Sequence, residues 1–151
     1  MNIQRIVCPV GKSEESFYAV PTAVRLAECW GAELILLHLD PDFLSRKEMT
    51  MLRVSPQEME KQMAESAQKE RQILMEQVKK LGLEGKISRI ILREGSKDHD
   101  IPREAEELGA DLLVIHTSGY NTLWEKTAGS TAASILRHSH ISVFILVRPS
   151  T

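Results

Sequence analysis

The chain has 151 residues, of which 42% are apolar and 26% are charged, and its formal net charge is -2. This length suits one domain over residues 1–151 with a single core, and the small net charge gives no electrostatic attraction for nucleic acid or an anionic membrane. No stretch approaches the roughly 18 uninterrupted apolar residues that span a bilayer, and the apolar run at the start is too short for a signal peptide. We therefore expect a cytoplasmic protein without a nucleic-acid or membrane partner.

Five apolar runs rich in β-branched residues predict strands. They cover residues 3–10, 32–39, 86–93, 111–117 and 141–147. Runs such as "LILL" and "VFIL" are apolar on both faces, which is typical of a parallel sheet covered by helices on each side.

Between the strands the apolar residues change to a helical period, and four stripes predict helices that face the sheet. Their members are Ala19, Ala23, Leu26, Ala27 and Trp30; Met59, Met63, Ala67, Leu74, Val78 and Leu81; Ile101, Ala105 and Leu108; and Ala128, Ala132, Ile135 and Leu136. Gly31, Gly82 and Gly109 stand where the first three helices should end, as a left-handed cap requires. The alternation predicts a single-domain, doubly wound α/β fold with a five-stranded parallel sheet and helices on both faces.

Ligands of doubly wound sheets collect at the carboxyl ends of the strands. The segments expected there are 9–13, 39–42, 94–100 and 116–130. The connection 40–56 is as long as loops that usually prove functional or disordered. Because this connection contains several large apolar residues, we interpret it as a packed flap or a partner contact. The apolar residues are Phe43, Leu44, Met49, Met51 and Leu52.

Metal-ligand residue types occur in the chain, but without an established metal-ligand spacing. Cys8 and Cys29 lack a paired motif, so we expect two buried free thiols. In "KDHD", Asp98 or Asp100 is better explained as the N-cap of the third helix, and "HLDPD", at 38–42, is interpreted as structural. "HSH", at 138–140, suits a helix C-terminus, where an imidazolium meets the negative end of the dipole. No metal site is predicted.

Four segments together resemble the universal stress protein family, and the resemblance covers nearly the whole chain. They are "RIVCPV", "GAELILLHLDP", "ELGADLLVIHTSG" and "GSTAASILRHSHISVFILVRP". The resemblance implies the strand order 3-2-1-4-5 and an ATP site, with adenine near the exits of the first two strands and phosphates on the loop and helix after the fourth. The residues implied as nucleotide-binding are Pro9, Val10, Gly11, Leu39, His116, Thr117, Gly119, Gly129, Ser130 and Thr131.

Elementary chemistry supports the phosphate half of this site. Gly119 would allow positive φ, and Gly129 would clear space for the ligand. Ser130, Thr131 and the free N–H groups of the helix start would donate hydrogen bonds to an anion. An ordinary turn followed by an N-cap explains the same residues equally well.

Two positions depart from the family pattern. The family motif is Gly, two residues, Gly, nine residues, Gly, then Ser or Thr, and Gly119, Gly129 and Ser130 match its later part. His116 stands where the first glycine of this motif belongs, and Gly11 stands where nucleotide-binding members usually carry an Asp. We therefore expect a degraded phosphate clamp with weak ATP binding, improving as the pH falls toward 6, because only a protonated imidazole would attract phosphate. Lys12 could replace the lost acid as a phosphate ligand, although a solvated loop lysine is more common.

Three functions remain open at this stage. The first is a stress-response module that binds a nucleotide, and the second is a dimeric interaction protein of the same fold without a nucleotide. The third is a weak ATPase, for which Glu94 or Asp98 would have to act as the base. No catalytic residue is assigned, so an enzyme is not expected.

The last strand predicts a homodimer. It lies at a sheet edge in the family's strand order, where unpaired N–H and C=O groups invite another chain. The residues expected at the interface are Val143, Phe144, Ile145, Leu146 and Val147.

Overall fold

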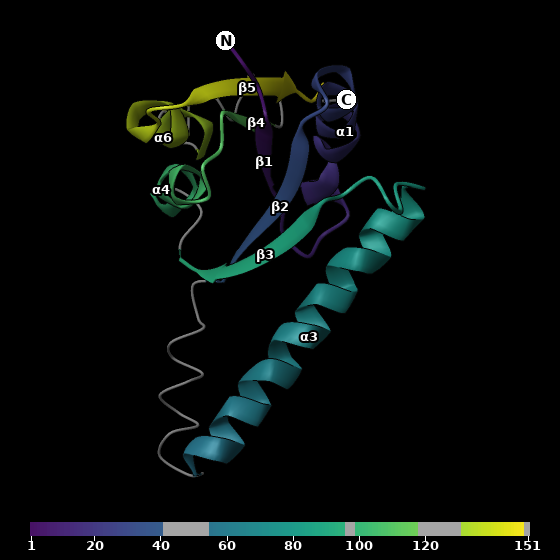
Figure 1. Cartoon of the computed structure of the whole chain (residues 1–151), viewed down its shortest axis with the longest axis vertical. Helices are drawn as coiled ribbons and strands as arrows, with labels where there is room; N and C mark the ends of the chain where they lie inside the picture. Colours follow the sequence, from purple (N-terminus) through teal and green to yellow (C-terminus); the bar gives the residue numbers. More distant parts are fainter. Residues whose placement is uncertain (41–54, 96–98, 118–130, 150–151) are drawn as a thin grey trace.

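The computed structural model describes residues 1–40, 55–95, 99–117 and 131–149. Its five strands form one sheet in which every neighbouring pair is parallel, with the order β3-β2-β1-β4-β5 (Figure 1). The strands are β1 (Arg5–Pro9), β2 (Glu33–Asp40), β3 (Arg89–Glu94), β4 (Leu112–Thr117) and β5 (Ser142–Val147). The fold class and strand order expected from the sequence are confirmed. Of the predicted flap, 40–56, residues 41–54 lie outside the described residues, while Asp40 ends β2 and Pro56 begins α3.

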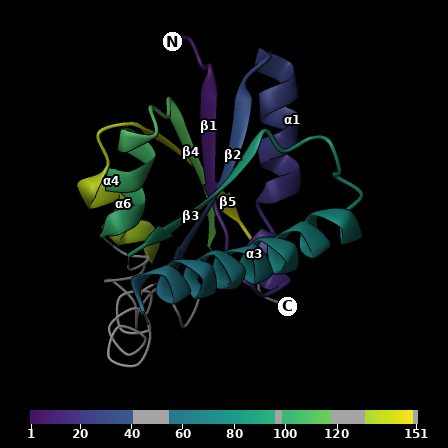
Figure 2. The same cartoon turned by 60° about the horizontal axis from the view of Figure 1, so that its bottom comes forward.

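Helices cover both faces of the sheet, which explains why the central strands are apolar throughout. Figure 2 shows α1 (Val20–Trp30) on one side of the strands, and α4 (Asp100–Glu107) with α6 (Thr131–His138) on the other. One core cluster joins α1 and α3 (Pro56–Lys80) to the sheet, through Ala23, Val24, Leu74, Val78, Ile6 and Leu36 among others. The second joins α4 and α6 to the opposite face, through Ile101, Ala105, Ile135, Val7, Leu37 and Ile115 among others.

The helix ends follow the predicted glycines. Gly31, Gly82 and Gly109 have φ of 61°, 69° and 76°, the left-handed region that glycine occupies without strain. The expected N-cap role of Asp100 is wrong. Asp100 lies within the first turn of α4, where its carboxylate faces the positive end of the helix dipole and pairs with Arg103 at 2.7 Å. Asp98 lies outside the described residues.

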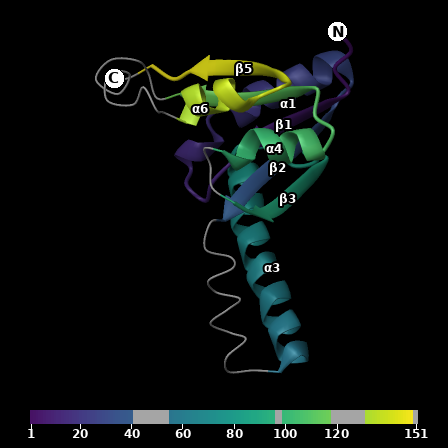
Figure 3. The same cartoon turned by 90° about the vertical axis from the view of Figure 1, so that its left-hand side faces the viewer.

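The prediction that the whole apolar stripe of α3 faces the sheet is wrong. Of its 25 residues only Glu70, Leu74 and Val78 are buried, and Figures 1 and 3 show the helix extending away from the sheet. A helix of this length spans about 37 Å, whereas a six-residue strand spans about 20 Å, so the helix is longer than the surface it covers. None of the helices in the described ranges combines the length and apolar character needed to cross a bilayer.

The expectation of two buried thiols is half wrong, because Cys8 is buried but Cys29 is exposed. Cys29 lies two residues after Ala27, a member of the buried stripe of α1, and two residues turn a helix by roughly 200°. Its side chain therefore points away from the sheet.

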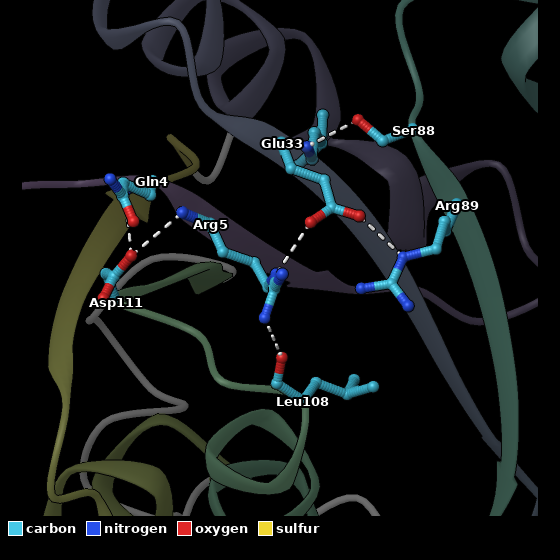
Figure 4. Close-up of polar contacts among 8 residues, drawn as sticks. Gln4, Arg5, Glu33, Ser88, Arg89, Leu108 and Asp111 are labelled. Carbon is cyan, nitrogen blue, oxygen red and sulfur yellow. Dashed lines mark hydrogen bonds and ion pairs between the residues drawn. The ribbon is translucent and has the colours of Figure 1, made fainter.

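Charged side chains join the strands at the amino-terminal edge of the sheet (Figure 4). Glu33 on β2 accepts hydrogen bonds from Arg5 Nε on β1 at 2.7 Å and from Arg89 Nε on β3 at 2.6 Å. Arg5 also donates to the carbonyl of Leu108, and the Asp111 carboxylate accepts from the backbone N–H of Arg5. These contacts lie at the edge opposite to the strand exits and hold three neighbouring strands in register.

Candidate ligand-binding site

A cavity of about 130 Å³ lies at the carboxyl ends of β1, β2 and β4. Its described lining comes from three strand exits, from η1 (Glu15–Phe17), and from α4 and α6. The lining residues are Pro9, Val10, Gly11, Ser16, Leu37, Leu39, Ile101, Ile115, His116, Ala132 and Ile135. Parallel strands end at one edge of a sheet, which is why residues so far apart in the chain meet here.

The structure brings together five of the residues proposed from the sequence, namely Pro9, Val10, Gly11, Leu39 and His116. Thr117 is half-buried at the end of β4, where its carbonyl accepts a hydrogen bond from the backbone N–H of Arg148 at 2.8 Å. Thr131 begins α6. The remaining three, Gly119, Gly129 and Ser130, lie outside the described residues.

Sequence reasoning missed six lining residues: Ser16, Leu37, Ile101, Ile115, Ala132 and Ile135. Five of these residues are apolar and lie in predicted strands or helix stripes, so the sequence identified them only as members of the hydrophobic core. They are Leu37, Ile101, Ile115, Ala132 and Ile135. Their position in the chain could have identified them as lining residues, because each lies close to the carboxyl-end edge of the sheet. Apolar side chains dominate this wall, which suits a flat apolar or aromatic group better than a charged one.

His116 is the one ionisable side chain among the described lining residues. Its ring lies 5.5 Å from that of Tyr18, centroid to centroid. Burial lowers the pKa of His116 below its ordinary value, the charge of Arg148 lowers it further, and Glu15 opposes the change. The imidazole is therefore neutral at pH 7. The protonation expected to attract phosphate thus requires more acidic conditions than an exposed histidine would need.

Beside the cavity, Lys12 is held by another partner. Its Nζ lies 3.3 Å from a carboxylate oxygen of Glu70, a buried residue of α3. His38, from "HLDPD", is also buried, and its Nδ1 donates to the carbonyl of Val10 at 3.0 Å. The first contact connects α3 to the segment after β1, and the second connects β2 to the same segment. Across the described ranges, no group of three or more His, Cys, Asp or Glu side chains is placed to hold a metal ion.

Among the described strands, the one proposed for dimerisation lies at the edge of the sheet and has β4 as its one neighbour. Val143 and Ile145 pack against the core shared with α4 and α6, and Leu146 packs against the opposite core. Phe144 and Val147 are 38% and 55% exposed. Two of the five predicted interface residues therefore present large apolar side chains to solvent.

The architecture and the position of the cavity define the chain as a doubly wound α/β protein with a site at the strand exits. A model of the universal stress protein family matches residues 2–148, and the chain belongs to this family.

Solved structures agree with this fold. A universal stress protein crystallised in complex with cAMP is 24% identical, with a TM-score of 0.64 over 97% of this chain and 98% of that one. Universal stress protein UspA from Lactobacillus plantarum is 18% identical, with a TM-score of 0.64 over 97% and 99% of the two chains. A universal stress protein from Archaeoglobus fulgidus is 19% identical, with a TM-score of 0.62 over 94% and 92%. No curated protein sequence matches the chain significantly.

Proposed function

We propose that this universal stress protein is a dimeric stress-response module that binds an adenine nucleotide weakly at the strand exits. The observation that carries the proposal is the cavity itself. It joins the segment after β1, represented by Pro9, Val10 and Gly11, to Leu39 on β2 and His116 on β4. The family resemblance places the base at the exits of β1 and β2, where Pro9, Val10, Gly11 and Leu39 lie, and the phosphates on the loop after β4, which begins near His116.

Adenine nucleotides are the ligands to test first. The similar universal stress protein in complex with cAMP holds an adenine nucleotide on the same fold. The apolar wall formed by Leu37, Leu39 and Ile115 provides a surface for a flat base. A volume of about 130 Å³ lies below the roughly 300–1,000 Å³ typical of sites for drug-sized ligands, so the described cavity suits a base-sized group and not a whole nucleotide.

Two features account for weak binding. Gly11 brings no carboxylate to the cavity, and each charge-assisted hydrogen bond lost with an acid is worth roughly 1.5–3 kcal/mol, or about tenfold or more in affinity. His116 places an imidazole at the cavity, and its lowered pKa keeps that ring uncharged at neutral pH. Protonated His116 would attract phosphate, so affinity should rise on acidification, but chiefly below the ordinary histidine pKa of about 6.5.

The test is calorimetric titration with ATP and with cAMP at pH 7. The unmodified protein should bind weakly, and the double variant Gly11→Asp with His116→Gly should bind ATP measurably more tightly. Adding Gly129→Val to that double variant should abolish binding, because the side chain fills the space expected for phosphate. Low-micromolar ATP affinity in the unmodified protein, independent of pH, would contradict the degraded site.

The second candidate is an interaction protein of the same fold that binds no nucleotide. The small, largely apolar cavity and the absence of an acid at Gly11 favour it. The absence of a heat of binding for either nucleotide, in the unmodified protein and the double variant alike, would select this function. ATP hydrolysis is a weaker third candidate, because Glu94 ends β3 and is not among the described lining residues, and a phosphate-release assay tests it.

A further inference from the structure

Arg148 lies at the same edge of the sheet as the cavity. It follows β5, and its backbone N–H donates to the carbonyl of Thr117 at the end of β4 at 2.8 Å. This hydrogen bond continues the parallel pairing of β4 with β5 by one residue, since Thr117 and Val147 are the last registered partners. The backbone of Arg148 is therefore held beside the end of β4, the strand that contributes His116 to the cavity.

The side chain of Arg148 is connected to the cavity through two ring contacts. Its guanidinium carbon lies 5.5 Å from the centroid of the Tyr18 ring, a cation–π distance. The Tyr18 ring lies 5.5 Å from that of His116, which lines the cavity. The effect of the Arg148 charge on His116 agrees with this proximity, because that charge is the second-largest cause of the lowered His116 pKa.

A surface groove of about 630 Å³ adjoins these residues and is lined in part by Glu15, Tyr18 and Arg148. The short helix η1 separates the groove from the cavity, since Glu15 lines the groove and the next residue, Ser16, lines the cavity. A phosphate attached to a group in the cavity would have to extend past His116 and η1 to reach the guanidinium of Arg148.

Glu15 pairs with Arg148. The two side chains form an ion pair while remaining 64% and 38% exposed. Ion pairs between exposed side chains contribute little to stability, because water screens them and both side chains lose conformational freedom. A phosphate group carries more charge and matches the two-pronged geometry of a guanidinium, so it can replace Glu15 at modest cost.

We propose that Arg148 binds the phosphate groups of a nucleotide whose base occupies the cavity, and that Glu15 is the internal competitor for this cation. The inference rests on the proposed function. It adds Arg148, at the end of β5, as a phosphate-binding residue beyond those expected on the loop with Gly119 and Gly129. The ligand class is a nucleoside polyphosphate, because the base needs the apolar cavity and the anion needs the arginine.

The experiment compares two single variants by calorimetry with ATP and adenosine at low salt and pH 8. Arg148→Met should weaken ATP binding about tenfold and leave adenosine binding unchanged, because adenosine lacks phosphate. Glu15→Gln should tighten ATP binding several-fold, because it frees Arg148 and removes a repelling charge. Changes of ATP affinity in opposite directions identify competition between Glu15 and ATP for Arg148. If the ion pair only stabilised the fold, both variants would change ATP affinity in the same direction. Matched controls are Arg137→Met and Glu60→Gln, which make the same charge changes at exposed positions of α6 and α3.

Tripolyphosphate as a second probe separates this inference from the proposed function. If neither ATP nor adenosine binds any variant, but tripolyphosphate binds and Arg148→Met removes that binding, the nucleotide proposal fails and the assignment of Arg148 stands. Unchanged ATP binding in Arg148→Met overturns the assignment. Weaker ATP binding in Glu15→Gln also overturns the assignment. The assignment is overturned as well if neither tripolyphosphate nor ATP binds the unmodified protein or Glu15→Gln.

Discussion

The two cysteines should differ sharply in reactivity. Burial raises the pKa of Cys8 to about 12, because the thiolate would lie in the apolar core, whereas Cys29 is exposed. Alkylation proceeds through the thiolate. Iodoacetamide at pH 8 should therefore modify Cys29 alone in the folded protein and both residues after unfolding in urea, as read by intact mass.

Cys29→Ser is the control for this labelling, since it should give no adduct while folded and one adduct when unfolded. Native labelling of Cys8 would show that the strand opens more easily than its complete burial indicates.

Glu33 should contribute to stability in a pH-dependent manner. The hydrogen bond from Arg5 is the largest cause that lowers the pKa of Glu33 below its ordinary value of 4.5, and Arg89 adds to it. A lowered carboxyl pKa means that the unfolded chain binds more protons in acid, so the stabilisation is complete above the ordinary pKa and is lost as the pH falls through the lowered value.

Glu33→Gln should accordingly lower the free energy of unfolding by about 1 kcal/mol at pH 7, a modest value because the partner arginines are partly exposed. The difference from the unmodified protein should shrink below pH 4.5. Glu28→Gln, which breaks the more exposed pair with Lys86, should cost less at neutral pH. Urea titrations from pH 3 to 7 measure both variants, and an equal cost at every pH would contradict the role of Glu33.

Individual site residues were predictable from the sequence only where the family resemblance supplied them. Gly11, Leu39 and His116, which the resemblance assigns to nucleotide binding, line the cavity, and their binding of a nucleotide stays a prediction. Tyr18 and Arg148 were not singled out, because their importance comes from the contacts of the Tyr18 ring with His116 and with Arg148, which lie about 100 and 130 residues further along the chain. Periodicity identifies a buried face, but it carries no information about which distant side chains meet at a strand exit.

The helices and strands were largely predictable, because parallel pairing and burial on both faces leave long apolar runs in the sequence. Helix α3 is the exception. Its apolar period extends back to Met59, but only Leu74 and Val78 among the predicted stripe are buried. The period of a helix indicates which side packs and does not indicate where the opposing sheet ends.

This difference along α3 can be measured. Leu74 is completely buried, so Leu74→Ala should lower the free energy of unfolding by about 2–5 kcal/mol through lost burial and a residual cavity. The neighbouring Met75 is 42% exposed, and Met75→Ala should change it by about 0.5 kcal/mol or less. Chemical denaturation followed by circular dichroism gives both values. Equal costs would mean that α3 packs differently from the way described.

Among the described residues β5 lies at an edge of the sheet, and we propose that whole molecules assemble through this edge. The strand pairs with β4 on one side, and parallel sheets leave a row of N–H and C=O groups at an unpaired edge. Phe144 and Val147 are exposed on this strand, while its other predicted interface residues pack against the two cores. Pairing two copies about a two-fold axis would satisfy the edge groups and cover both exposed side chains.

We therefore expect a homodimer at micromolar concentration, with twice the chain mass in sedimentation equilibrium. Phe144→Lys and Val147→Lys should each shift the mass toward that of the monomer, because a charged side chain would be buried at the interface without a partner. Leu136→Lys is the matched control, since Leu136 is 53% exposed on α6 and its substitution should leave the dimer intact. Ile145→Lys is less informative, because Ile145 packs against the core and its loss would disturb the fold as well as the edge. A monomeric unmodified protein, or a dimer that persists in both Phe144→Lys and Val147→Lys, would exclude assembly through β5.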